Sequence, residues 1–145
     1  MKIITDTREQ LPYWTTTKRK LEVGDYTTQK LEGIFHIERK SLQDLYGTLV
    51  QGNGRFKYEL WRAAYHQITI EVHVEGTLDD FINKRFPYGK ERKFTTHGLN
   101  ELIKTFTKKY KLVFVWYTGR KSAQKGVEMR LLDAEKNIKK SYKKF

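Results

Sequence analysis

The order of hydrophobic patterns along the chain is the feature that most constrains its fold. Apolar and polar residues alternate over 68–74, as in a half-buried strand, and 112–117 is a continuous apolar run typical of a buried strand. Helical spacing follows each of them, with apolar positions at Leu99, Leu102, Ile103 and Phe106, and later at Val127, Leu131, Ala134, Ile138 and Tyr142. Strands that alternate with helices predict an α/β fold in which a mixed central sheet is flanked by helices.

The first third of the chain has the composition of strands that lead into helices. Residues 2–5 and 21–29 are β-prone, and a turn at Gly33 leads into a further strand over 34–40, so the last two strands are expected to form a hairpin. Ser41 is a good N-cap for the helix that follows, and a second helix is expected over 55–65.

Size and composition indicate one folded domain over residues 1–145. We find no Pro/Ser-rich linker, internal repeat or low-complexity tract in the 145 residues. The sequence has no cysteine, and its four histidines lack paired zinc spacing, so any metal is expected to be held by oxygen. Because no secretory signal or membrane-spanning apolar run is present, we expect an intracellular protein, cytoplasmic or, in a eukaryote, nuclear.

The charge of the chain points to a polyanionic partner. Twenty-nine Lys and Arg against 17 Asp and Glu give a net charge of +12. Such an excess attracts nucleic acid and gives sequence-independent affinity through counterion release. A basic domain that binds RNA or acidic proteins without any metal is the alternative that charge alone leaves open.

One short stretch carries residues suited to phosphodiester chemistry. Side chains two apart in a strand point the same way, so Glu38 and Lys40 are expected to share one face, with Arg39 on the other. If the preceding strand pairs with this one, Asp25 brings a second carboxylate to the same edge. Mg²⁺ is usually held by one or two carboxylates with waters and phosphate oxygens, so these residues predict a hydrolytic metal site.

The order of the motifs resembles a known nuclease family. Asp6-Thr7-Arg8-Glu9, Val23-Gly24-Asp25-Tyr26, Glu38-Arg39-Lys40-Ser41 and Asp44-Leu45 follow one another within some forty residues. This order is similar to the signature of the XPF/Hef structure-specific endonucleases, GDx(n)ERKx(3)D with an upstream acidic pair. The chain contains no glycine-rich helix-hairpin-helix motif of the kind that typical members carry after the nuclease domain.

The resemblance implies a restriction-endonuclease-like fold and an endonuclease that cuts DNA near junctions of double and single strands with Mg²⁺ or Mn²⁺. It implies metal ligation by Asp25, Glu38 and Asp6, and a catalytic lysine at Lys40. Further catalytic candidates by position are Glu9 and Arg39, although a salt bridge on the opposite sheet surface is an equal alternative for Arg39. Asp44 would lie nearby, or would serve only the first turn of its helix. Family members often act as dimers, so a homodimer or a nuclease partner subunit is also implied.

Basic residues outside the motif are candidates for contacts with DNA. Those chosen are Arg8, Arg55, Lys57, Lys84, Arg85, Lys90 and Arg92. The loop over 84–93 interleaves its charges with Phe86 and Tyr88, which could stack on unpaired bases, or it could be a solvated basic loop. A catalytically silent DNA-binding module of the same fold is the main alternative function.

Overall fold

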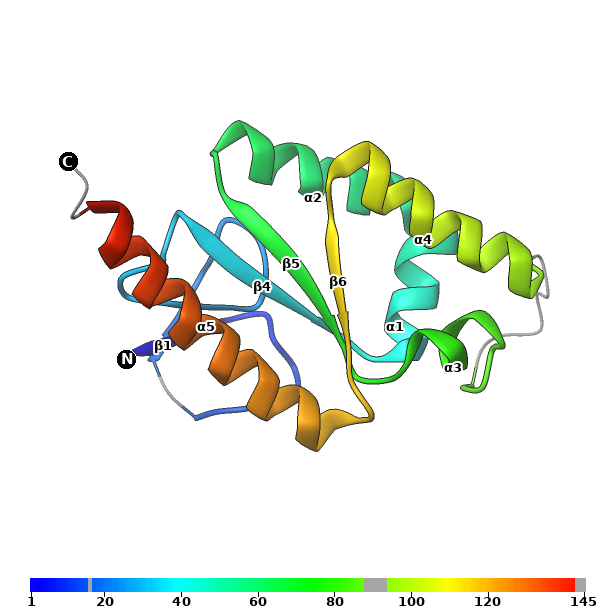
Figure 1. The fold of residues 1–145 in the computed structure, drawn as a ribbon, viewed down its shortest axis with the longest axis horizontal. Helices are drawn as coiled ribbons and strands as arrows, with labels where there is room; N and C mark the ends of the chain where they lie inside the picture. The colour runs from blue at the N-terminus through cyan, green and yellow to red at the C-terminus, as the bar shows by residue number, and fades with distance from the viewer. Residues whose placement is uncertain (16, 88–93, 143–145) are drawn as a thin grey trace.

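A single mixed sheet organises the molecule in the computed structural model, which describes residues 1–15, 17–87 and 94–142, with side chains described up to residue 138. Within these residues six strands are ordered β2-β1-β3-β4-β5-β6 (Figure 1). The strands are β1 (Ile3–Asp6), β2 (Thr17–Arg19), β3 (Tyr26–Thr28), β4 (Phe35–Lys40), β5 (Thr69–Val74) and β6 (Val113–Trp116). The helices are α1 (Leu42–Tyr46), continued by a π-helical turn η1 (Gly47–Gln51), then α2 (Asn53–Tyr65), α3 (Leu78–Ile82), α4 (Thr96–Tyr110) and α5 (Arg120–Tyr142).

The strand directions confirm the predicted mixed sheet. Strand β3 pairs antiparallel with both β1 and β4, so the predicted hairpin is present, whereas β4, β5 and β6 run parallel to one another. Strand β2 runs parallel to β1 at the other edge. The α/β architecture expected from the sequence is therefore the observed one.

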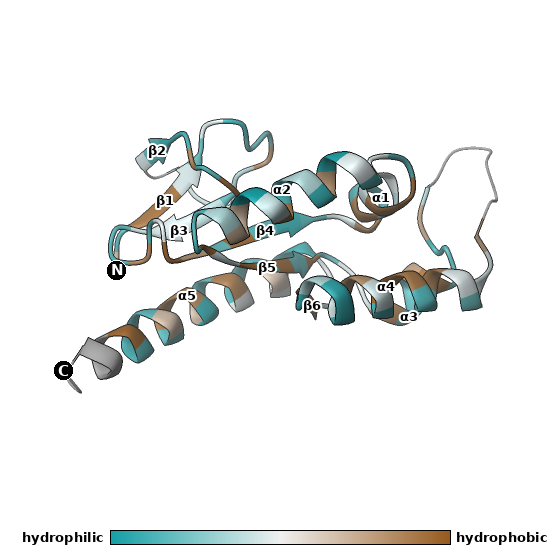
Figure 2. Cartoon of the chain, turned by 90° about the horizontal axis from the view of Figure 1, so that it is seen from above, coloured by the Kyte–Doolittle hydropathy of each residue, from teal (hydrophilic) through white to brown (hydrophobic). Residues whose placement is uncertain are grey.

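Two hydrophobic cores lie on opposite faces of the sheet. Helices α1, α2, α3 and α4 pack on one face, around buried residues such as Phe56, Val72 and Phe106. Helix α5 packs on the other face, against Phe35 and Ile37 of β4. Figure 1 shows α2 above β4 and β5 and α5 below them, and Figure 2 gives the view from above, in which the strands follow one another from β2 to β6. Among the described residues we find no helix that has the length and apolar character to cross a membrane.

Strand β4 separates its side chains between these two layers as the period of two predicts. Phe35 and Ile37 belong to the core under α5. Glu38 and Lys40, which alternate with them, pair with each other on the α2 side. The face assignment that the candidate site depends on is therefore correct.

Three details of the strand predictions are wrong for identifiable reasons. The strand expected over 21–29 forms only at Tyr26–Thr28, because Gly24 has a φ of +78°, a left-handed conformation that interrupts it. Strand β5 is not half-buried: α5 also covers its polar face, where Glu71 pairs with His73 and Arg130. Strand β6, expected to be buried, is the sheet edge, with Val113 47% exposed.

Candidate active site

The position of Asp25 depends on Gly24, because no other residue fits at position 24 without strain. A Cβ on Gly24 would lie 3.1 Å from Cβ of His36 and 3.2 Å from the carbonyl oxygen of Ile37. This close approach lets the Asp25 amide donate to the Ile37 carbonyl at 2.8 Å, while the Asp25 carbonyl accepts from the Asp6 amide at 2.8 Å. These two hydrogen bonds fix Asp25 between β1 and β4. The sequence predicted this position, at the same edge as Glu38 and Lys40.

His36 supports this turn and is not a metal ligand. The Gly33 amide donates to its Nε2 at 2.9 Å, so Nδ1 carries the proton and donates to the Val23 carbonyl at 2.6 Å. Burial lowers the pKa of His36, which keeps the ring neutral. The histidine thereby ties β4 to the segment that precedes Asp25.

Glu38 and Lys40 form an ion pair beside Asp25, with Lys40 Nζ 3.2 Å from Glu38 Oε1. Glu59 of α2 lines the same hollow as Glu38, and its charge helps to raise the pKa of the Glu38 carboxyl. Both side chains of the ion pair are largely buried, Glu38 at 10% and Lys40 at 18% exposure. The helix α2 therefore closes the candidate site from the side opposite the strand.

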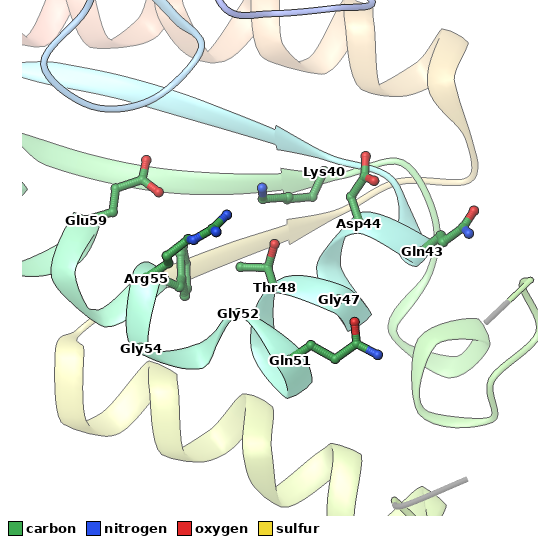
Figure 3. A pocket seen from close by; sticks show the side chains of 11 residues that line it. Lys40, Gln43, Asp44, Gly47, Thr48, Gln51, Gly52, Gly54, Arg55 and Glu59 are labelled. Atoms are coloured by element: carbon green, nitrogen blue, oxygen red, sulfur yellow. The ribbon is translucent and has the colours of Figure 1, made fainter. Parts of the chain in front are cut away.

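Two adjoining hollows open onto these groups. One is lined by four acidic residues, Asp6, Asp25, Glu38 and Glu59, and by three basic residues, Arg8, Arg55 and Arg62. The other includes Lys40, Asp44, Thr48 and again Arg55 and Glu59. Figure 3 shows the Lys40 side chain reaching from β4 toward the α2 residues Arg55 and Glu59. Carboxylates and cations thus face one accessible space.

The carboxylates of this space repel one another. Burial raises the pKa of Glu38 well above its usual range, and the charges of Asp25 and Glu59 raise it further. Burial and the charge of Glu9 raise the pKa of Asp25 to about 7. Burial alone would lower the pKa of Lys40, but the neighbouring carboxylates outweigh it and raise the pKa, so the ammonium form is favoured.

The donor set fits a hard divalent cation. Asp25 and Glu38 offer carboxylate oxygens, which Mg²⁺ and Mn²⁺ accept, and their mutual repulsion would be relieved by a bound cation. Over the ranges that the structure describes, no group of three His, Asp or Glu side chains forms a complete set of metal ligands. The fit is therefore of the two-carboxylate kind, in which waters and phosphate oxygens complete the coordination.

Asp6 lines the same hollow, but its carboxylate is already paired with Arg8 and hydrogen-bonded to the backbone. Its carboxylate accepts hydrogen bonds from Arg8 Nε at 2.9 Å and from the Leu21 amide at 2.8 Å. Burial by itself would raise the pKa of Asp6, but these hydrogen bonds lower it below the usual value. Its role as a metal ligand stays a prediction, and in this structure it holds Arg8 at the rim.

Glu9 and Arg39, both expected at the catalytic centre, lie instead on the α5 side of the sheet. Arg39 is 8% exposed and binds Glu9 through two nitrogens, at 2.8 and 2.9 Å, and Glu75 at 2.8 Å. Tyr13 donates to the other oxygen of Glu75 at 2.6 Å. Neither residue lines the two hollows, so the salt-bridge reading of Arg39 is the one that the geometry favours.

The predicted DNA contacts divide into three groups. Arg8 and Arg55 line the acidic hollow. Lys57 is exposed on α2 outside that lining, Lys84 Nζ donates to the Phe94 carbonyl at 2.7 Å, and Arg85 pairs with Asp79 and Asp80. Lys90 and Arg92, with Tyr88 and Lys93, lie outside the described residues.

Two residues of the site were missed by sequence reasoning, Glu59 and Arg62. Both belong to α2 and follow Arg55 at positions i+4 and i+7, so the three share one helix face. Asp44 is exposed; its amide donates to Ser41 Oγ at 3.0 Å, which caps α1. The available signal for Glu59 and Arg62 was a charged stripe that flanks the apolar stripe Phe56, Leu60 and Ala63 on α2, one position before each of its residues.

Comparison with known proteins identifies the fold. No family model matches the chain, and no curated protein sequence does. Among solved structures, XPF from Aeropyrum pernix matches with a TM-score of 0.70 and 17% identity, over 99% of this chain and 69% of that one. The same protein in complex with DNA matches with a TM-score of 0.69 and 19% identity, over 94% and 66% of the two chains. The fold is XPF-like, as the motifs predicted.

Proposed function

We propose that this chain is a divalent-metal-dependent DNA endonuclease that hydrolyses phosphodiesters at flaps, forks or other branched structures. The observation that carries the proposal is the pair of half-buried Asp25 and buried Glu38, which line one hollow and whose carboxylates repel each other beside the ammonium of Lys40. Arg8 and Arg55 line the same hollow with cationic groups that can bind phosphates. The net charge of +12 favours DNA as the ligand.

Asp25 and Glu38 would hold Mg²⁺ or Mn²⁺, which when bound polarises the phosphate and lowers the pKa of a coordinated water. Lys40 keeps its proton, because the neighbouring carboxylates raise its pKa, and it donates hydrogen bonds to the nucleophilic water or to a phosphate oxygen. Arg8, held by Asp6, and Arg55, on the first turns of α2, bind the flanking phosphates and fix the register of the strand.

A catalytically silent DNA-binding module of the same fold is the second candidate. Such a module needs cations toward the DNA and gains nothing from like charges buried beside a polyanion. The cost of keeping Asp25 and Glu38 ionised in one buried place therefore favours a site that uses a cation. A solved structure of similar fold is an XPF in complex with DNA, which agrees with DNA as the partner in either case.

The experiment incubates the purified chain with labelled duplex, single-strand, flap, fork and four-way-junction DNA, in EDTA, Mg²⁺ or Mn²⁺. We expect cleavage of one or more branched substrates only when metal is present. D25N and K40A should abolish cleavage while DNA binding in EDTA stays within about twofold, because these residues are not the main phosphate ligands. Equal binding by all variants and no cleavage in any metal would favour the silent module.

A further inference from the structure

An aromatic ladder made of Tyr58, Trp61 and Tyr65 runs along the outer face of α2. The Tyr58 and Trp61 rings lie 5.8 Å apart between centroids with planes 25° from parallel, and Trp61 and Tyr65 lie 5.4 Å apart at 24°. The three residues are 59%, 56% and 70% exposed. More than half of each residue therefore faces solvent despite the internal stacking.

The aromatic ladder is not needed for the packing of α2. The helix already buries Phe56, Leu60 and Ala63 against the sheet and α4, and the ladder lies outside this apolar stripe. Ring pairs at i,i+3 and i,i+4 stabilise a helix only slightly. Three large rings exposed side by side are instead the kind of surface that marks a binding site.

The ladder connects two hollows of the surface. Tyr58 lines the hollow that contains Asp25 and Glu38. Trp61 lines a separate hollow between α2 and the end of α4, together with Lys109, Tyr110 and Lys111. Helices α2 and α4 lie next to each other (Figure 1). The centroids of the Phe56 ring on α2 and the Phe106 ring on α4 are 5.5 Å apart. A strand that leaves the candidate site along α2 thus passes over aromatic rings toward further cations.

Cations accompany the rings along this route. The Arg62 guanidinium lies 5.9 Å from the centroid of the Tyr58 ring, and Arg62 lines the same hollow as Tyr58, together with Arg8 and Arg55. Lys109 and Lys111 line the hollow beside Trp61. Stacking rings interleaved with Lys and Arg are the arrangement by which proteins hold a single strand without reading its sequence.

We propose that the aromatic ladder is a stacking track for the unpaired bases of a DNA strand whose backbone continues into the candidate site. The inference deepens the proposed function, on which it rests, by assigning the single-stranded arm of the branched substrate to α2. Tyr65 lies seven positions after Tyr58 on α2, which is a rise of about 10 Å and corresponds to about three nucleotides at a spacing of about 3.4 Å per nucleotide.

The test measures binding in EDTA, by fluorescence anisotropy, of the full chain to an oligothymidylate and to a blunt duplex of equal length. W61A and Y65A should each weaken single-strand binding about tenfold, because one stacked base is lost, and leave duplex binding within about twofold. W61F should restore most of the affinity, since it keeps a ring. The matched control is M129A on α5, which removes an apolar side chain of similar exposure at 58% and should change neither affinity.

Two results would overturn the stacking track. Equal loss on duplex and single strand would make the ladder a general support of α2, which circular dichroism melts of W61A would reveal as a loss of stability. Unchanged single-strand affinity, with sedimentation that shifts from dimer to monomer in W61A, would make the ladder a contact between two copies. The binding test is done without metal, so its result does not depend on whether the chain hydrolyses DNA. The cleavage test with D25N likewise does not depend on whether the aromatic ladder binds a single strand.

Discussion

Replacing Asp25 by Asn should stabilise the metal-free protein at neutral and alkaline pH. Burial and the charge of Glu9 raise the pKa of Asp25 from 3.8 to about 7, so its ionised form is disfavoured in the folded state. The substitution removes that charge, while the side-chain oxygen of Asn can still accept the Arg39 amide hydrogen that Asp25 Oδ2 now accepts at 2.7 Å. A carboxylate that is needed for function is expected to persist even though it lowers the stability of the folded protein.

The size of the effect follows from linkage. Each tenfold change in proton affinity is worth about 1.4 kcal/mol, so ionised Asp25 costs the folded state about 4 kcal/mol at most. Sharing of the repulsion with Glu38 reduces the expected gain to about 2–4 kcal/mol. Because the pKa of Asp25 is raised in the folded state, the contribution of Asp25 to wild-type stability is fully present below pH 3.8. This contribution is lost as the pH rises toward about 7. The advantage of D25N should therefore be absent at low pH and level off above about 7.

Urea unfolding in EDTA at several pH values, followed by circular dichroism, measures this difference. E128Q, on exposed Glu128 of α5, is the matched control and should be indistinguishable from wild type at every pH. Added Mg²⁺ should stabilise wild type, because binding to the folded state adds to its stability, and should leave D25N nearly unchanged. A D25N protein that is less stable than wild type at high pH in EDTA would refute the account of repelling carboxylates.

Further substitutions test the supports of the site and its contacts with DNA. R39A should cost about 3–5 kcal/mol of unfolding free energy by urea melts, because it removes both guanidinium hydrogen bonds of the Glu9 carboxylate and one partner of Glu75; a loss under about 1 kcal/mol would contradict this. G24A should cost about 1–3 kcal/mol in the same melts, since alanine is strained at that φ and crowds His36; no loss would mean that the turn adjusts. R8A and R55A should each lower the slope of log affinity against log salt by about one in duplex titrations, and an unchanged slope would exclude phosphate contact.

Local pattern was sufficient to predict which side chains the candidate site brings together, because that grouping depends on strand geometry. The alternation of Glu38 and Lys40 with Arg39 places the first two on one face and the third on the other, whatever the rest of the fold does. The antiparallel pairing of β3 with β4 then brings Asp25 to the same edge. Both relations hold within a short segment, which is why the sequence sufficed.

Long-range relations were beyond the same reasoning. Glu59 lies near Glu38 only because α2 packs over β4. The spacing of residues within α2 does not indicate which strand the helix covers. Strand β6 reads as a buried run, yet it is the edge of the sheet, since strand order is not a local property. Glu71 and His73 look like solvent-facing positions, but α5, far along the chain, covers them and supplies Arg130.

The resemblance implied catalytic roles for Glu9 and Arg39, and the structure places both residues outside the linings of the two hollows. The two bind each other and Glu75 under α5, at the back of the strand that carries Glu38 and Lys40. From there Glu9 acts on the site only through its charge, which contributes to the raised pKa of Asp25. Their importance for folding is the more direct expectation.

The single-turnover rate of cleavage of one labelled forked DNA, measured against Mg²⁺ concentration with protein in excess, tests the nuclease most directly. Wild type and E128Q should give the same rate, rising with metal and then saturating. D25N and E38Q should give no product at any concentration while they still bind the fork. Cleavage by D25N at the wild-type rate, or product formed by wild type in EDTA, would contradict a reaction built on Asp25 and Glu38.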